Sequence, residues 1–258
     1  MAFTIKNFLQ KLKSSEINSS EQTIKKLRWT ETGSPVFSLR KEIAARYLRG
    51  EGIEIGALHA PTDVPSGVTV RYLDRMSTAQ LKRTYPELSE YELAEVDIVD
   101  DGEILTSVLN GSVDFVIANH MVEHCQNPIF TLENWLRVLK PGGILYIGVP
   151  DKRYTFDKDR PVTALAHLIR DYTEGPEWSM NSHYEEWVRL VEKTSDDNIV
   201  RRAKALAELN HSIHFHVWTQ VEFFEFLVYC RNNLSLPFDI ELLQKNELEF
   251  IVILKKQN

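Results

Sequence analysis

The chain has 258 residues, of which 43% are hydrophobic and 26% are charged, and these fractions are close to the averages for globular proteins. They exclude a disordered chain, a collagen-like repeat and a disulfide scaffold. The net charge of -7 argues against a general nucleic-acid binder, whose surface is normally strongly basic, so we expect no nucleic-acid partner.

The charge is unevenly distributed along the chain. Residues 1–50 carry ten basic and four acidic side chains, so the remainder is strongly acidic. Residues 2–13 place Phe8, Leu9 and Leu12 on one helical face, which is typical of a short amphipathic helix packed on the domain, of a mobile arm or of a membrane-surface helix. The polar residues that follow, up to residue 35, read as a linker. We therefore predict a basic N-terminal extension over residues 1–35, followed by a single domain over 36–258.

The cysteines and the apolar runs indicate the compartment. Cys125 and Cys230 are isolated and belong to no pairing motif, which fits a reducing cytosol. No stretch reaches the roughly 18 consecutive apolar residues that a membrane helix requires. We expect a cytoplasmic protein without integral membrane association.

Strands and helices are predicted to alternate through the first part of the domain. Apolar residues at helical spacing predict helices over 36–49 and 129–139, and the second helix is expected to stop in a turn at Lys140-Pro141-Gly142-Gly143. Short apolar runs predict strands over residues 52–57, 68–73, 93–99, 113–118 and 144–149. This alternation indicates right-handed crossovers and a parallel sheet.

The second part of the chain departs from this alternation. Residues 151–218 are polar, helix-prone and rich in aromatic side chains, and we predict that they form a cap insert that folds over the ligand cleft. Thr219 then reads as the N-cap of a helix that runs through Leu227. Apolar runs over 238–243 and 249–254 predict an antiparallel hairpin at one side of the sheet.

Ligands of open α/β sheets bind beyond the carboxyl ends of the strands, so the residues that end the predicted strands are the candidates for a site. Gly56 ends the first strand and would let the backbone approach a ligand closely. Asp74 ends the second strand, twenty residues after Glu54, and is placed to accept both hydroxyls of a ribose. Asp101 follows the third strand, and Asn119-His120 follow the fourth.

Four segments resemble the class I S-adenosylmethionine-dependent methyltransferases. They are Glu54-Ile55-Gly56, Tyr72-Leu73-Asp74, residues 101–105 (DGEIL) and residues 113–149, which read VDFVIANHMVEHCQNPIFTLENWLRVLKPGGILYIGV. The resemblance covers residues 36–150 well, and the helix and hairpin over 219–255 agree in order with that family. It implies a Rossmann-like, doubly wound, mostly parallel seven-stranded sheet with an antiparallel C-terminal hairpin, and S-adenosylmethionine as the cofactor.

The resemblance also implies a role for each matching residue. Glu54 and Gly56 would line the methionine and ribose side of the cofactor, and Asp74 would hold the ribose hydroxyls. Asp101 and the backbone at Gly102 would meet the adenine ring. Asn119 and His120 would border the cleft near the sulfonium and the acceptor. Ala57 and Arg75, which follow Gly56 and Asp74, are further cofactor-binding candidates.

One departure concerns the loop after the first strand. The family usually has glycines two and four residues after the first glycine, and this chain has Leu58 and Ala60 there. The cofactor carries no pyrophosphate, so the loop need not cradle phosphates as a dinucleotide loop does. The missing dinucleotide glycine pattern makes a nicotinamide dehydrogenase the weaker interpretation.

Two groups of polar residues have structural as well as functional interpretations. Glu123-His124 would cap and pin the following helix rather than act in catalysis. His211, His214 and His216 suggest a metal site, but no nearby cysteine completes a ligand set, so ordinary polar packing is favoured and no metal is expected.

The predicted reaction is methyl transfer to a small-molecule or glycan acceptor, by O-methylation of a hydroxyl. The opening of the insert, residues 150–157, is similar to uncharacterised bacterial methyltransferase-domain proteins that are often encoded near glycosyltransferases, which suggests the sugar acceptor. If a base is needed, the candidates are His120, Asp151, Tyr154 and His183. The alternative is a non-catalytic module with the same fold that binds a partner, for which Leu58 and Ala60 are the support.

Overall fold

The computed structural model describes residues 35–88 and 90–258. The predicted basic extension, with its amphipathic segment 2–13, lies outside these residues except for Pro35. Within the described residues no helix has the length and apolar character needed to cross a bilayer.

Seven strands form one sheet in the order β3-β2-β1-β4-β5-β7-β6. The strands are β1 (Glu51–Ile55), β2 (Thr69–Asp74), β3 (Ile98–Val99), β4 (Val113–Asn119), β5 (Leu139–Pro150), β6 (Phe238–Asn246) and β7 (Glu249–Lys256). β1 to β5 pair in parallel, whereas β7 lies antiparallel between β5 and β6. This confirms the predicted Rossmann-like, doubly wound sheet with its antiparallel hairpin. The strand order reverses between β1 and β4, which is where such sheets bind ligands.

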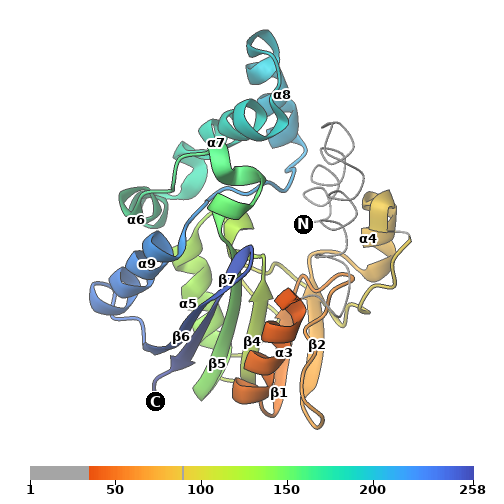
Figure 1. The fold of residues 1–258 in the computed structure, drawn as a ribbon, viewed down its shortest axis with the longest axis vertical. Coiled ribbons are helices and arrows are strands. Elements are labelled where there is room, and N and C mark those ends of the chain that lie inside the picture. Colours follow the sequence, from red (N-terminus) through yellow and green to blue (C-terminus); the bar gives the residue numbers. More distant parts are fainter. Residues whose placement is uncertain (1–34, 89) are drawn as a thin grey trace.

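Helices cover both faces of the sheet (Figure 1). The α-helices are α3 (Pro35–Tyr47), α4 (Thr78–Thr84), α5 (Pro128–Val138), α6 (Leu165–Glu174), α7 (Met180–Trp187), α8 (Ile199–Glu208) and α9 (Gln220–Asn232). In β4, Phe115 and Ile117 are buried against α3, whereas Val116 and Ala118 belong to the cluster that α5 and α9 complete. Successive side chains of a strand point to opposite faces of the sheet, so β4 contributes to the core on both faces.

Residues 151–218 form the insert, which Figure 1 shows at one end of the sheet, with α6, α7 and α8. It has a hydrophobic cluster of its own, centred on Trp187 in α7, to which α8 contributes Ile199 and Leu206. The described residues also include seven short helical segments: η1 (Pro86–Leu88), η2 (Val122–His124), η3 (Lys152–Tyr154), η4 (Phe156–Asp159), η5 (Pro176–Trp178), η6 (Val188–Glu192) and η7 (Asp196–Asn198).

Three local predictions were wrong. The turn expected at residues 140–143 lies within β5, because Leu139 already pairs with Val113 of β4. The strand expected over 93–99 contracts to Ile98–Val99, because Leu93 instead packs in a loop against Leu58. Glu123-His124 do not cap α5, whose N-cap is Asn127, with its side chain accepting a hydrogen bond from the Phe130 amide.

Candidate functional site

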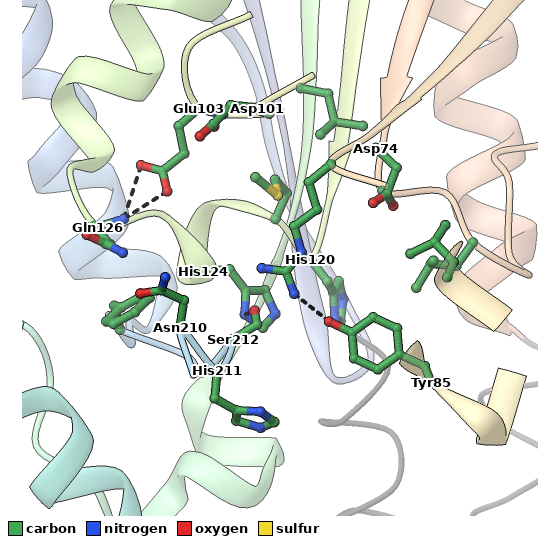
Figure 2. A pocket seen from close by; sticks show the side chains of 18 of the residues that line it. Asp74, Tyr85, Asp101, Glu103, His120, His124, Gln126, Asn210, His211 and Ser212 are labelled. Atoms are coloured by element: carbon green, nitrogen blue, oxygen red, sulfur yellow. Dashed lines mark hydrogen bonds between the residues drawn. The ribbon is translucent and has the colours of Figure 1, made fainter. Parts of the chain in front are cut away.

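A cavity of about 230 Å³ opens at the carboxyl ends of the parallel strands. Figure 2 shows Asp74, Asp101 and His120 on its sheet side, and Asn210, His211 and Ser212 of the insert facing them. The cavity therefore lies between the sheet edge and the insert.

The structure brings six of the predicted cofactor-binding residues to the wall of this cavity: Gly56, Asp74, Arg75, Asp101, Gly102 and His120. Glu54, Ala57 and Asn119 are buried and lie outside the lining. The Glu54 carboxylate accepts a hydrogen bond from the Thr62 hydroxyl at 2.7 Å, and Asn119 Nδ2 donates to the same hydroxyl at 2.8 Å. Glu54 and Asn119 thus hold the loop after β1 through Thr62, on the side of the loop that faces away from the cavity lining.

The loop after β1 turns through left-handed backbone conformations. Gly56 has φ 67° and Leu58 has φ 52°. Leu58 therefore adopts a conformation that favours glycine, although its side chain is buried against Leu81 and Leu88 in a small apolar cluster. The backbone at Leu58 turns as a glycine would, and packing of its side chain compensates for the strain.

Asp74 and Gly102 occupy adjacent strand ends. Burial raises the pKa of Asp74, whose carboxylate accepts a hydrogen bond from the Met76 amide at 3.3 Å. At Gly102 a Cβ atom would come within 2.7 Å of Ile55 and 2.9 Å of the Met121 methyl group, so glycine keeps this wall thin. Trp135 Nε1 fixes the Gly102 carbonyl with a 2.8 Å hydrogen bond.

His120 is held at the end of β4 by a buried carboxylate. Its backbone has φ 50°, and its Nε2 lies 2.6 Å from Oε2 of Glu249, the first residue of β7. The Glu249 carboxylate also accepts hydrogen bonds from Arg40 Nε at 2.8 Å and from Asn246 Nδ2 at 2.6 Å. Burial alone would raise the pKa of Glu249, but Arg40 and His120 lower it to about 2, so this carboxylate is ionised.

The other three catalytic candidates lie outside the cavity lining. Asp151 is buried, and its carboxylate accepts hydrogen bonds from Arg153 Nε at 2.9 and 3.2 Å. The Tyr154 hydroxyl accepts from Lys245 Nζ at 3.0 Å on the exterior. His183 is buried inside the insert, where its Nε2 lies 3.0 Å from that of His167.

Several residues of the site escaped sequence reasoning. Glu103 lines the cavity and accepts a hydrogen bond from the Gln126 amide at 3.2 Å. The insert adds Tyr184, whose hydroxyl donates to the His211 carbonyl at 2.9 Å. Glu249 could have been found, because a strand antiparallel to β5 must begin at the edge where β5 ends.

Part of the sequence matches a known protein family. A family model described as "Methyltransferase domain" matches residues 65–147, which include Asp74, Asp101 and His120. No curated protein matches the chain.

Three solved structures illustrate the similarity. An S-adenosylmethionine-dependent methyltransferase from Methanosarcina mazei is 17% identical, with 82% of this chain and 95% of that chain covered and a TM-score of 0.45. A possible histamine N-methyltransferase from Thermotoga maritima is 14% identical (92% and 95% covered, TM-score 0.47). A methyltransferase from Aquifex aeolicus is 13% identical (96% and 98% covered, TM-score 0.47).

Proposed function

We propose that the chain is a class I S-adenosylmethionine-dependent methyltransferase, and that it methylates a hydroxyl of a small-molecule or glycan acceptor with His120 as the general base. The observation that carries this proposal is that His120 lines the cavity and that its Nε2 lies 2.6 Å from the buried, ionised carboxylate of Glu249.

The residues of the cavity fit the cofactor. The Asp74 carboxylate, at the end of β2, would accept hydrogen bonds from the two ribose hydroxyls. Asp101 would accept from the adenine amino group, and the thin wall at Gly102 would admit the flat ring. Gly56 would lie on the methionine side, and Glu54, Ala57 and Asn119 would support that loop from beneath. These acidic groups also suit the positive charge of a sulfonium.

Bound S-adenosylmethionine supplies a methyl group on a positively charged sulfur, which an attacking acceptor displaces. A neutral hydroxyl must lose its proton as it reacts, and a base at the site can take it. Because Glu249 is ionised and can only accept, His120 Nε2 carries the proton of that contact, and the lone pair of the neutral ring is on Nδ1. Glu249 thus acts as a positioning residue that orients His120.

The insert side of the cavity supports a polar acceptor. Asn210, Ser212 and Tyr184 bring amide and hydroxyl groups to this wall, as recognition of a polyhydroxylated molecule would require. We therefore propose that the insert selects the acceptor and that sugars, free or in a glycan, are the class to examine first.

The test is methyl transfer from S-adenosylmethionine to a panel of nucleotide sugars and glycans. His120→Gln should lower kcat by about 100- to 10,000-fold while cofactor binding persists. His59→Gln, which changes a histidine outside the cavity lining, should leave kcat unchanged. Equal rates for the native protein and His120→Gln would refute the base. If the chain bound neither S-adenosylmethionine nor S-adenosylhomocysteine, the non-catalytic alternative would replace the proposal.

A further inference from the structure

Four metal-ligating side chains meet inside the insert, away from the methyl-transfer site. His167 and Asp171 are one turn apart on α6, His183 is on α7, and His216 lies in the segment before α9. One ligand atom of each lies within 4.8 Å of all the others. Three separate segments therefore contribute to a single cluster.

Three of the six distances between these atoms are close to the edge length of a metal-centred tetrahedron. His167 Nε2 lies 3.0 Å from His183 Nε2 and 3.3 Å from Asp171 Oδ2, and His216 Nε2 lies 3.5 Å from the same oxygen. A tetrahedral Zn²⁺ with bonds of 2.0–2.1 Å has edges of about 3.3 Å. No large movement of the backbone is needed to place an ion at the centre.

The polar groups of the cluster are incompletely satisfied by the described residues alone. Asp171 is fully buried, and its Oδ2 accepts no hydrogen bond from them. Its Oδ1 accepts from the Ser179 hydroxyl at 3.1 Å, as the outer oxygen of a metal-bound carboxylate commonly does. His216 Nε2 has one competing contact, at 3.4 Å from the Gln126 carbonyl, and its Nδ1 has no hydrogen-bond partner among these residues.

A second group is less suited to an ion. Glu123, His124 and His214 also lie close together, but His124 Nε2 and His214 Nε2 are 4.0 and 3.8 Å from Glu123 Oε1. His214 is further held by Asp157, 2.7 Å from its Nδ1. This group is wider and offers three ligands, so the cluster on α6 and α7 is the stronger candidate.

We propose that His167, Asp171, His183 and His216 bind one divalent transition-metal ion, and that Zn²⁺ suits them best. Three imidazoles and one carboxylate are typical zinc donors, whereas Mg²⁺ and Ca²⁺ prefer oxygen ligands. The ion would join α6, α7 and residues 211–218. His183 directly precedes the cavity residue Tyr184, and His216 directly follows the cavity residue Phe215, so the ion would fix the insert wall of the cavity. The side chain of His167 is 23% exposed, so the ion would enter the cluster from the side of His167.

The test is metal analysis of the full chain, prepared without a histidine tag, incubated with Zn²⁺ and dialysed. The native protein should retain about one Zn²⁺ per chain. Asp171→Asn and His183→Gln should retain less than a tenth of that amount, and Ser179→Ala should weaken binding roughly 10- to 100-fold. His211→Gln, which changes a histidine of the insert outside the cluster, is the matched control and should retain the ion.

Co²⁺ substitution of the native protein gives a readout that needs no variant, because tetrahedral Co²⁺ absorbs visible light strongly. Circular dichroism of each variant establishes that it is folded. The proposal is overturned if the native protein retains no stoichiometric metal and gives no tetrahedral Co²⁺ spectrum, or if folded Asp171→Asn retains the ion. Loss of the ion in His214→Gln but not in His183→Gln would place it in the second group and would also overturn the proposal. None of these measurements depends on methyl transfer, so they can fail or succeed independently of the proposed reaction.

Discussion

Glu103 is a carboxyl group whose protonation is tuned by the cavity it lines. Burial raises its pKa to about 7, assisted by the negative charge of Asp101, while the hydrogen bond from the Gln126 amide opposes the shift. Its ordinary pKa is 4.5, so between these two values the folded chain holds a proton that the unfolded chain has lost. The free energy of unfolding therefore falls as the pH rises through this window.

Glu103→Gln removes this proton uptake. The free energy of unfolding of the variant relative to the native protein should rise by roughly 1–3 kcal/mol as the pH increases from 5 to 8, and level off above that. Urea denaturation at several pH values measures it. Glu92→Gln, at an exposed position, should show no such trend, and a difference for Glu103→Gln that does not change with pH would contradict the assignment.

At the scale of elements, one buried ion pair joins α3 to β7. Arg40 of α3 donates to both carboxylate oxygens of Glu249, and both side chains are buried. Removing one partner of such a pair leaves an uncompensated charge in the interior, which costs far more than the pair itself contributes. The same carboxylate positions His120, so Glu249 both holds α3 against β7 and orients the candidate base.

Arg40→Met should therefore lower the free energy of unfolding by about 3–5 kcal/mol. The double variant Arg40→Met/Glu249→Gln should recover part of this loss, because no unpaired charge remains. A double-mutant cycle by chemical denaturation makes the comparison. Strictly additive losses would show that the two residues are not coupled.

Local patterns made some elements predictable. The apolar run of β4 identified a strand buried on both faces, and Thr219 was correctly expected to be the N-cap of α9, where its hydroxyl accepts from the Val221 amide. The early start of β5 was not predictable, because it depends on pairing of Leu139 with Val113 across the sheet. A bulge of this kind leaves no periodic signal in the strand itself.

The candidate site was predictable where it follows strand ends. Asp74, Asp101 and His120 were found because parallel strands deliver their carboxyl ends to one edge. Glu103 and the insert wall depend on how loops fold back, which no local spacing encodes. The cluster around Asp171 was missed for the same reason, because its ligands are spread from residue 167 to residue 216.

At the scale of the whole molecule, the insert is a separate layer placed over the sheet edge. Its own cluster around Trp187 makes it internally cohesive, and the Phe215 amide ties it to the Glu123 carbonyl by a 2.7 Å hydrogen bond. Residues 210–215 are the part of the insert that contributes most to the cavity wall, whereas α8 contributes none of the lining residues.

Binding of S-adenosylhomocysteine should therefore slow amide hydrogen exchange in residues 210–215 more than in α8. This is expected because a ligand that binds only the folded form of residues 210–215 suppresses the local unfolding of that segment. Exchange followed by mass spectrometry compares the two segments within one sample. Equal protection of both segments, or none, would contradict a cavity shared between the sheet and the insert.

Calorimetric titration with S-adenosylhomocysteine tests the central claim, cofactor binding at the strand-end cavity, most directly. The native protein should bind with one-to-one stoichiometry, and Asp74→Asn should bind about 10- to 100-fold more weakly, because hydrogen bonds to a charged acceptor are lost. Asp63→Asn, at an exposed carboxylate paired with Lys41, should bind like the native protein. Absence of binding to the native protein, or equal affinity for Asp74→Asn, would contradict the account.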